Sequence, residues 1–226
     1  MKKLILITQS KGGSGKSVLA YLLAEKYPNA VIFDMDDATK TTTKQLAYRK
    51  PVPVTFMNSN NVIDRGLFND FLEIIGKAKN DLFIADLGAS VSEQLPYYFN
   101  EVAEYLPALL EEMKIQLEIF AVVGGANIFQ PTMEYLDLLY TSSKGSFPIK
   151  VYKNEYFDFS EKQSIDLDTN TKEKNISIQP FTISRDKNES TQNRIREVLK
   201  SGEGVAKANA FSKIYFQSAL KNIEIN

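Results

Sequence analysis

A short polar segment holds two lysines and three glycines at a spacing suited to phosphate chemistry. It reads Lys-Gly-Gly-Ser-Gly-Lys-Ser over residues 11–17. The backbone N–H groups of such a turn converge on one anion, and glycine leaves no Cβ atom between the backbone and a phosphate. The ammonium group of Lys16 would reach the terminal phosphates of a nucleotide, and the hydroxyl of Ser17 is a suitable ligand for Mg²⁺. The segment therefore predicts a site for a phosphorylated ligand and a divalent cation.

The residues on either side of this segment form the elements that must position it. An apolar run over 4–7 precedes the segment, and an apolar helical pattern over 18–24 follows it. The order strand, turn, helix places the turn at a helix N-terminus, where the helix dipole favours an anion. The predicted nucleotide contacts here are Gly12, Gly13, Ser14, Gly15, Lys16, Ser17 and Val18.

The turn departs from the ordinary P-loop pattern at its first position. That pattern, G-x-x-x-x-G-K-[ST], requires glycine at position 10, where this chain has Ser10 followed by Lys11. The segment instead resembles the deviant Walker A motif of the ParA/MinD family of ATPases. By this resemblance, Lys16 is the P-loop lysine. Lys11 is then a signature lysine that reaches the phosphates of the partner subunit in an ATP-bound homodimer.

The second predicted strand, 30–34, ends in a cluster of carboxylates. Asp34-Met35-Asp36 matches the Asp-x-Asp that the family usually has at this place. The resemblance implies that Asp36 positions or activates the attacking water and that Asp34 supports the Mg²⁺ site. The residues alone also allow a solvated acidic turn that caps the next helix. With Lys11 and Lys16, Asp36 completes the set of predicted catalytic residues.

The third predicted strand, 82–86, is apolar and ends in Asp86. It resembles a Walker B strand, in which the carboxylate would hold Mg²⁺ through Ser17 or through a water molecule. Mg²⁺ keeps several waters and takes few protein ligands, so a single aspartate is enough. An aspartate that only begins a turn is the other interpretation that the residues allow. The predicted metal site consists of Ser17, Asp34 and Asp86.

Two asparagines compete as the contact to a nucleotide base. In related ATPases an asparagine after a late strand contacts the adenine edge, and by that resemblance Asn154, after the strand 148–153, is the predicted contact. Asn127 is its competitor, and a plain turn role for Asn154 is also open because asparagine is common in turns. The run over 178–181 resembles the segment that packs against the base, so Pro180 is also assigned to the nucleotide site.

The composition bounds the class of protein. The chain has 226 residues, an apolar fraction of 43% and a net charge of −1, which fit one nucleotide-binding domain over 1–226. It has no cysteine and no histidine, which excludes disulfides, cysteine-held iron–sulfur clusters and the usual zinc sites. Its apolar runs are shorter than the ~20 residues that span a bilayer, so we expect a cytoplasmic protein.

Apolar runs alternate with helical patterns along the chain, which is typical of βαβ units. The expected fold class is an α/β P-loop NTPase, with a mostly parallel central sheet flanked by helices on both faces in three layers. The polar stretch 158–175 fits either a surface helix or a loop. The predicted strands are 3–8, 30–34, 82–86, 116–123, 148–153 and 176–181, with 52–57 as a further short strand. The predicted helices are 16–27, 38–48, 65–78, 93–113, 130–143, 190–200 and 206–221.

The C-terminal part of the chain has a basic excess and a final helical pattern. Basic side chains outnumber acidic ones over 185–221. Such an excess fits non-specific DNA binding with association to the nucleoid, and it also fits a plain solvated face. The pattern over 206–221 favours a helix that packs on the core, because its polar face has too few charges for membrane binding.

The later motifs indicate a subfamily and a function. Asp-Leu-Gly-Ala over 86–89 and Lys-Asn-Glu over 153–155 are similar to the small ParA-like proteins of plasmid stabilisation and mobilisation, the StbB/TraL type. The resemblance implies a switch that dimerises on ATP, hydrolyses it slowly with Mg²⁺, and is stimulated by a partner protein. Its output would be partition, positioning or transfer of plasmid or mobile-element DNA. Two alternatives stay open, a metabolic ATP-dependent ligase or kinase of the dethiobiotin synthetase type and a degenerate nucleotide-binding scaffold.

Overall fold

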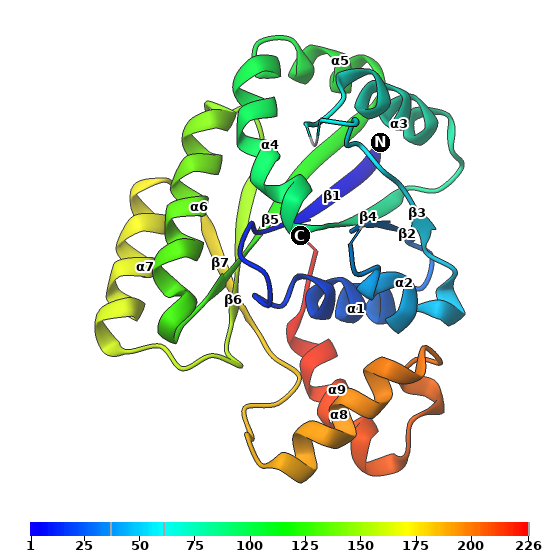
Figure 1. Ribbon diagram of the computed structural model, residues 1–226, viewed down its shortest axis with the longest axis vertical. Helices are drawn as coiled ribbons and strands as arrows, with labels where there is room; N and C mark the ends of the chain where they lie inside the picture. The colour runs from blue at the N-terminus through cyan, green and yellow to red at the C-terminus, as the bar shows by residue number, and fades with distance from the viewer. Residues whose placement is uncertain (37, 61, 226) are drawn as a thin grey trace.

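Parallel strands form one seven-stranded sheet in the part of the chain that the computed structural model describes, residues 1–36, 38–60 and 62–225. The strand order is β3-β2-β4-β1-β5-β6-β7, so the strand that precedes the glycine-rich turn lies at the centre (Figure 1). The strands are β1 (Lys2–Thr8), β2 (Val31–Met35), β3 (Val52–Pro53), β4 (Leu82–Leu87), β5 (Ile115–Gly124), β6 (Ile149–Asn154) and β7 (Ser177–Phe181).

The register brings the polar strand ends to one edge of the sheet. Ile7 of β1 lies opposite Asp86 of β4, and Asp34 of β2 lies opposite the same Asp86. Because all three strands run in the same direction, the turn after β1 and the two aspartates meet beyond their carboxyl ends. This is the edge where open α/β sheets bind ligands.

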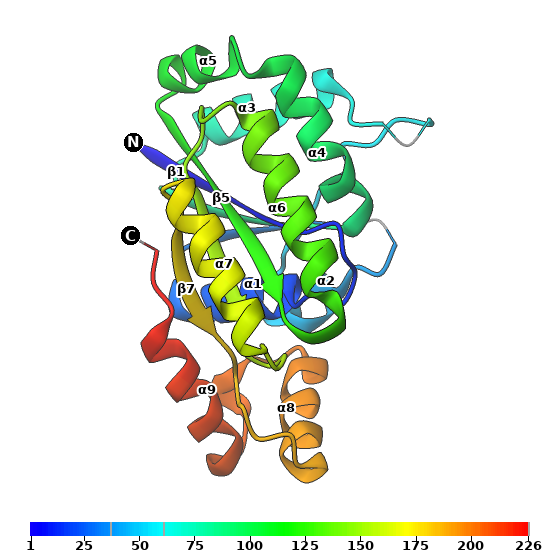
Figure 2. The same ribbon diagram turned by 90° about the vertical axis from the view of Figure 1, so that its left-hand side faces the viewer.

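Helices cover both faces of the sheet, which gives three layers (Figures 1 and 2). The first face carries α3 (Arg65–Lys77), α4 (Ala89–Val102), α5 (Leu106–Glu112), α6 (Phe129–Ser143) and α7 (Glu161–Glu173). The second face carries α1 (Lys16–Lys26), α2 (Thr41–Gln45), α8 (Glu189–Ser201) and α9 (Ala210–Asn222). Since both faces are covered, the central strand is apolar on both sides, and Leu4, Ile5, Leu6 and Ile7 are fully buried.

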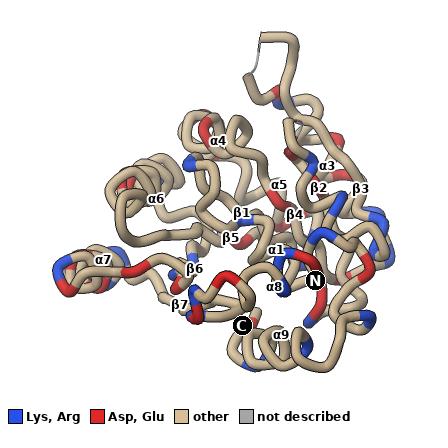
Figure 3. Tube along the Cα trace, turned by 60° about the horizontal axis from the view of Figure 1, so that its bottom comes forward, with Lys and Arg blue, Asp and Glu red and all other residues tan. Residues whose placement is uncertain are grey.

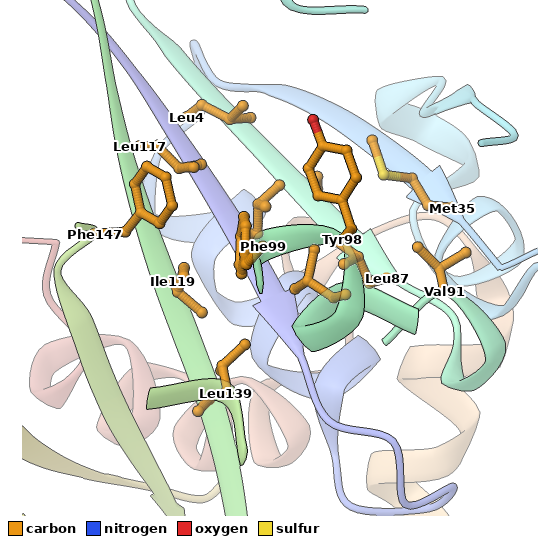
Figure 4. Packing of buried hydrophobic residues seen from close by; sticks show 14 of the residues in the cluster. Leu4, Met35, Leu87, Val91, Tyr98, Phe99, Leu117, Ile119, Leu139 and Phe147 are labelled. Carbon is orange, nitrogen blue, oxygen red and sulfur yellow. The ribbon is translucent and has the colours of Figure 1, made fainter. Parts of the chain in front are cut away.

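The larger core cluster fixes α4 against the centre of the sheet. Phe99 of α4 is fully buried and lies among Leu4, Leu117 and Ile119 of the strands below it (Figure 4). Its ring centroid is 5.0 Å from that of Phe147. Truncating a buried phenylalanine of this kind typically costs about 3–5 kcal/mol. The cluster therefore holds rigidly the helix that begins directly after the end of β4.

The structure confirms the expected fold class and corrects two of the predicted helices. The helix expected over 93–113 is two helices, α4 and α5. Pro107 stands in the first turn of α5 and has no N–H to donate to the carbonyl of Ala103, although α4 itself continues through Pro96. That carbonyl instead accepts from the hydroxyl of Ser146 at 3.4 Å.

The helix expected over 38–48 is also shorter. Helix α2 covers only Thr41–Gln45, and a 3₁₀ turn, Ala47–Arg49, follows it. The side chain of Asp36 accepts hydrogen bonds from the backbone of Ala38 and Thr39, which makes a local turn before the helix. Of the strand expected over 52–57, only Val52–Pro53 is in the sheet.

The structure decides the polar stretch left open by the sequence and agrees with the expected packing of the final helix. The polar stretch 158–175 forms α7, which begins at a capping box made by Ser160 and Gln163. Helix α9 packs on the core through Phe216 and Ala219, whereas Phe211 is 68% exposed and Ile214 is 61% exposed. None of the helices within the described residues has the length and apolar character required to cross a membrane.

Candidate functional site

The glycine-rich turn borders a cavity of about 430 Å³ at the carboxyl edge of the sheet. Gly13 and Gly15 have φ angles of 74° and 106°, which place both in the left-handed region that glycine adopts without strain. A Cβ atom added at Gly12 or Gly13 would meet nothing within 4 Å. The turn therefore presents bare backbone to open space, and α1 begins immediately after it with its N-terminus toward the cavity.

Lys16 lines this cavity and is held by the turn itself. Its Nζ donates a hydrogen bond to the backbone carbonyl of Gln9 at 2.7 Å, and the side chain is buried. Burial lowers the pKa of Lys16, while the charges of Asp86 and Asp36 oppose that shift. The ammonium group thus has one neutral acceptor and two nearby carboxylates. It is placed to move onto a phosphate oxygen.

Gln9 anchors the start of the turn, a role that sequence reasoning missed. Its side chain is fully buried, and its Nε2 donates to the carbonyl of Val122 at 2.8 Å and to that of Thr132 at 3.3 Å. Its Oε1 accepts from the backbone N–H of Lys11 at 3.2 Å. The available signal was an amide side chain at the end of an apolar strand, directly before the glycines.

Lys11, in contrast, is exposed and lines neither this cavity nor the second one described below. Its backbone N–H donates to the side chain of Gln9. The predicted trans role of Lys11 remains a prediction.

Asp86 is the most deeply buried carboxylate at the cavity. Its Oδ2 accepts a hydrogen bond from Oγ1 of Thr42 at 2.5 Å, and its Oδ1 has no hydrogen-bond partner among the described residues. Burial raises the pKa of Asp86 to about 6, although the hydroxyls of Thr42 and Ser17 and the charge of Lys16 pull it downward. A buried carboxylate oxygen without a partner is costly, and a cation would remove that cost.

These residues fit a Mg²⁺ ion that is bound together with a nucleotide. Asp86 supplies one oxygen that has no partner within the described part of the chain, and the hydroxyl of Ser17 interacts with the same carboxylate. Among residues 1–36, 38–60 and 62–225, no group of three or more acidic, histidine or cysteine side chains could hold a metal alone. The remaining ligands would therefore be phosphate and water oxygens, as Mg²⁺ prefers.

Asp34 and Asp36 shape the segment after β2. Both oxygens of Asp34 accept backbone hydrogen bonds, Oδ1 from Asp36 at 3.1 Å and Oδ2 from Thr43 at 2.6 Å, and Asp34 does not line the cavity. Asp36 does line it. Burial opposes ionisation of Asp36, but hydrogen bonds from Thr39 and Ala38 and the charge of Lys16 outweigh it and lower the pKa. The contacts of Asp34 support the geometry of this segment, and its predicted Mg²⁺ role stays a prediction.

Gly88 is required by the close approach of two strand ends. A Cβ atom there would lie 2.9 Å from Cα of Asp36 and 3.0 Å from the carbonyl oxygen of Met35. The backbone N–H of Gly88 also donates to that carbonyl at 3.1 Å. The end of β4 and the segment that carries Asp36 therefore cannot shift independently.

A second cavity, of about 220 Å³, adjoins the first. The two share Gly13, Gly15 and Val18, so they meet above the turn and the first residues of α1. The loop 182–184 after β7 forms another wall of the second cavity. Gln192 and Arg196 of α8, together with the apolar Ile195 and Leu199, close it from the remaining side. Sequence reasoning missed these α8 residues and this loop, because nothing local in either segment indicates a ligand.

Asn154 lines the second cavity and braces the turn. Its Nδ2 donates to the carbonyl of Ser14 at 2.8 Å, and its Oδ1 accepts from the backbone N–H of Tyr156 at 3.1 Å. A Cβ atom at Gly15 would lie 2.3 Å from that Nδ2, so the amide fits directly beneath the turn. Pro180 lines a neighbouring cavity instead, and Asn127 is exposed and lines neither cavity of the site. The assignment of Asn154 as the adenine contact stays a prediction.

Comparison with known proteins gives two curated relatives, both Escherichia coli proteins named Protein TraL. They are 29% and 28% identical to this chain over 163 residues. The match covers 70% of this chain and 65% of each relative, so part of the relatives' length has no counterpart in it. No family model matches the chain.

Two solved structures were also found. One is the 54 kDa protein of the signal recognition particle from Aeropyrum pernix K1 in complex with GDP, 12% identical, with a TM-score of 0.48 over 78% of this chain and 41% of that one. The other is a plasmid partition protein from Borrelia burgdorferi B31 bound to AMPPNP, 13% identical, with a TM-score of 0.49 over 99% of this chain and 100% of that one. From its own strand order and turn geometry, the chain has a P-loop NTPase fold, and its sequence is similar to that of the TraL proteins.

Proposed function

We propose that this chain binds ATP with Mg²⁺ and hydrolyses it slowly, as a switch between a monomer and an ATP-bound homodimer. The observation that carries the proposal is the junction of the two cavities at Gly13, Gly15 and Val18. A ligand with a phosphate tail in one cavity and a flat ring in the other would lie across that junction, over the N-terminus of α1. A nucleoside triphosphate has this shape.

The residues of the phosphate cavity can divide the work of phosphoryl transfer. Lys16 would exchange its hydrogen bond with Gln9 for one with a phosphate oxygen. Mg²⁺, held by Ser17 and Asp86, would neutralise charge on the phosphates. Asp36, on the cavity wall and with a lowered pKa, would hold the attacking water opposite the leaving oxygen.

Dimerisation is proposed from the position of Lys11. An exposed ammonium group beside the phosphate turn is free to contact the nucleotide of a second copy. With the γ-phosphate present, Lys11 would make this contact and the closed dimer would be favoured. Loss of the γ-phosphate on hydrolysis would remove the contact and release the dimer. As the resemblance implies, turnover would be slow until a partner protein completes the site.

The output proposed from the resemblance is partition, positioning or transfer of plasmid or mobile-element DNA. Basic side chains on α8 and α9 would supply non-specific DNA contacts. The charged residues within α9 are Lys213 and Lys221, and the hairpin that this helix forms with α8 lies at one end of the molecule (Figures 1 and 3). A metabolic ligase or kinase of the same fold is the competing function.

The test is the release of ADP from ATP by the purified chain, alone, with double-stranded DNA, and with candidate small-molecule acids or amines. Slow basal release that DNA or a partner protein accelerates supports the switch. Release that depends on a small-molecule co-substrate would replace the switch by the ligase or kinase. Binding of ATP with no release under any condition would leave only a nucleotide-binding scaffold.

A further inference from the structure

The first turn of α2 is tied to two neighbouring strands through two adjacent threonines. Oγ1 of Thr42 donates to Oδ2 of Asp86 on β4 at 2.5 Å. The backbone N–H of Thr43 donates to Oδ2 of Asp34 on β2 at 2.6 Å. Thr42 is 1% exposed and Asp86 is 2% exposed, so water does not compete for the first of these hydrogen bonds.

We infer that Thr42 is a positioning residue for the proposed Mg²⁺ site, an inference that rests on the proposed function. The terminal torsion of an aspartate, χ2, has a broad range of orientations. The hydrogen bond from Thr42 occupies one oxygen of Asp86 and fixes the plane of the group. The other oxygen, Oδ1, is buried and has no hydrogen-bond partner among the described residues. Thr42 thereby selects which oxygen is presented to the cation.

Thr42 is well suited to this role for two reasons. Its β-branched side chain has few rotamers on a helix, so the donor is held in place. The hydroxyl also donates to the charged form of the carboxylate, which is the form that binds a cation. Outer hydrogen-bond partners of this kind typically change metal affinity by about 10- to 100-fold when removed.

The same contacts join the cation site to the proposed catalytic carboxylate. Asp34 accepts from the backbone of both Asp36 and Thr43, so one side chain holds the two ends of the segment. Thr42 ties that segment to β4. A shift of Asp86 toward a cation would therefore be transmitted to Asp36 through α2. The hydrogen bonds of Asp34 and Thr42 therefore connect the metal ligand to the water-positioning group.

The chain supplies a matched control one residue along. Thr43 has the same side chain on the same helix, but its Oγ1 is buried and has no hydrogen-bond partner among the described residues. Thr43→Val keeps the size of the side chain and removes its hydroxyl, without removing a hydrogen bond. Thr42→Val removes the hydroxyl that contacts Asp86, and Thr42→Ser keeps it.

The experiment measures ATP affinity by calorimetry in Mg²⁺ and in EDTA, for the wild-type chain and the three variants. The readout is the ratio of the two affinities, which needs no turnover. We expect Thr42→Val to lower this ratio about 10-fold or more, Thr42→Ser to restore most of it, and Thr43→Val to match the wild type. Affinity in EDTA should change little in all three.

A ratio for Thr42→Val equal to that of Thr43→Val would overturn the positioning role while leaving the proposed function intact. A wild type whose ATP affinity does not respond to Mg²⁺ would overturn the proposed Mg²⁺ site, and this inference with it. If thermal unfolding shows that Thr42→Val does not fold, Thr42→Ala is measured in the same way. Its ratio of ATP affinities in Mg²⁺ and in EDTA is then compared with that of Thr43→Val.

Discussion

Asn154 Nδ2 lies 2.8 Å from the carbonyl oxygen of Ser14 and donates a hydrogen bond to it, which joins the end of β6 to the glycine-rich turn after β1. These residues are 140 positions apart in the chain. The second polar atom of the amide is also engaged, because Oδ1 accepts from the backbone of Tyr156. A side chain with both polar atoms engaged acts first on the shape of the turn and only secondarily on a base.

This contact predicts how substitutions of Asn154 change nucleotide affinity. Asn154→Ala leaves the buried carbonyl of Ser14 without its donor, at a cost of about 1–3 kcal/mol. We expect the affinities for ATP and GTP to fall by the same factor, about 10-fold, because the turn and not the base contact is disturbed. Competition binding with the two nucleotides measures this. A loss confined to ATP would instead assign Asn154 to recognition of adenine.

Asp86 predicts a distinctive dependence of stability on pH. Its pKa is raised to about 6 in the folded chain from an ordinary value of 3.8. The folded state therefore holds the proton more tightly. The stability linked to Asp86 is fully present below about pH 4 and is lost as the pH rises through about 6.

Asp86→Asn should remove this loss. In the absence of ligand we expect the variant to match the wild type near pH 4 and to exceed it in free energy of unfolding by roughly 2–3 kcal/mol near pH 8. Urea unfolding at several pH values gives the difference. If the difference in free energy of unfolding between the two proteins is constant across that range, the pKa of Asp86 is not raised in the folded chain. The same variant should lose the effect of Mg²⁺ on ATP affinity.

The exposed position of Lys11 predicts that its substitution affects ATP-dependent dimerisation but not ATP binding by the monomer. Lys11→Ala should leave the affinity of the monomer for ATP within about 2-fold of the wild type, because the exposed side chain does not line the cavity of its own subunit. It should weaken or abolish the ATP-dependent dimer, which sedimentation velocity detects. Lys187→Ala, at another exposed lysine, serves as the control for loss of charge. A normal dimer in Lys11→Ala would remove the trans role.

The position of Asp36 on the cavity wall predicts that its substitution slows hydrolysis but retains ATP binding. Asp36→Ala should retain ATP binding and dimerisation but hydrolyse ATP at least 10-fold more slowly, because the carboxylate that positions water is gone. Single-turnover measurements with saturating Mg²⁺ separate this from a loss of affinity. Hydrolysis at the wild-type rate would exclude Asp36 as the catalytic carboxylate.

The local parts of the site were predictable from the sequence, because each lies within a few consecutive residues. The glycines and lysines between a predicted strand and a predicted helix indicate the turn over 11–17. The carboxylates Asp34 and Asp86 each end an apolar run.

The long-range parts were not predictable. The hydrogen bond from Gln9 to Val122 spans 113 positions, and that from Thr42 to Asp86 spans 44. A buried glutamine or threonine has no sequence pattern that reveals its partner, because the partner is set by strand order and register. The α8 wall of the second cavity has the same origin, because it exists only once α8 packs beside α2 and α9.

The most direct test of the central claim is calorimetric titration of Mg²⁺-ATP into the wild type and into Lys16→Ala. We expect the wild type to bind one ATP per chain and Lys16→Ala to show no measurable binding while unfolding at a similar temperature. Equal affinity in the two proteins would contradict the assignment of the glycine-rich turn as the phosphate site.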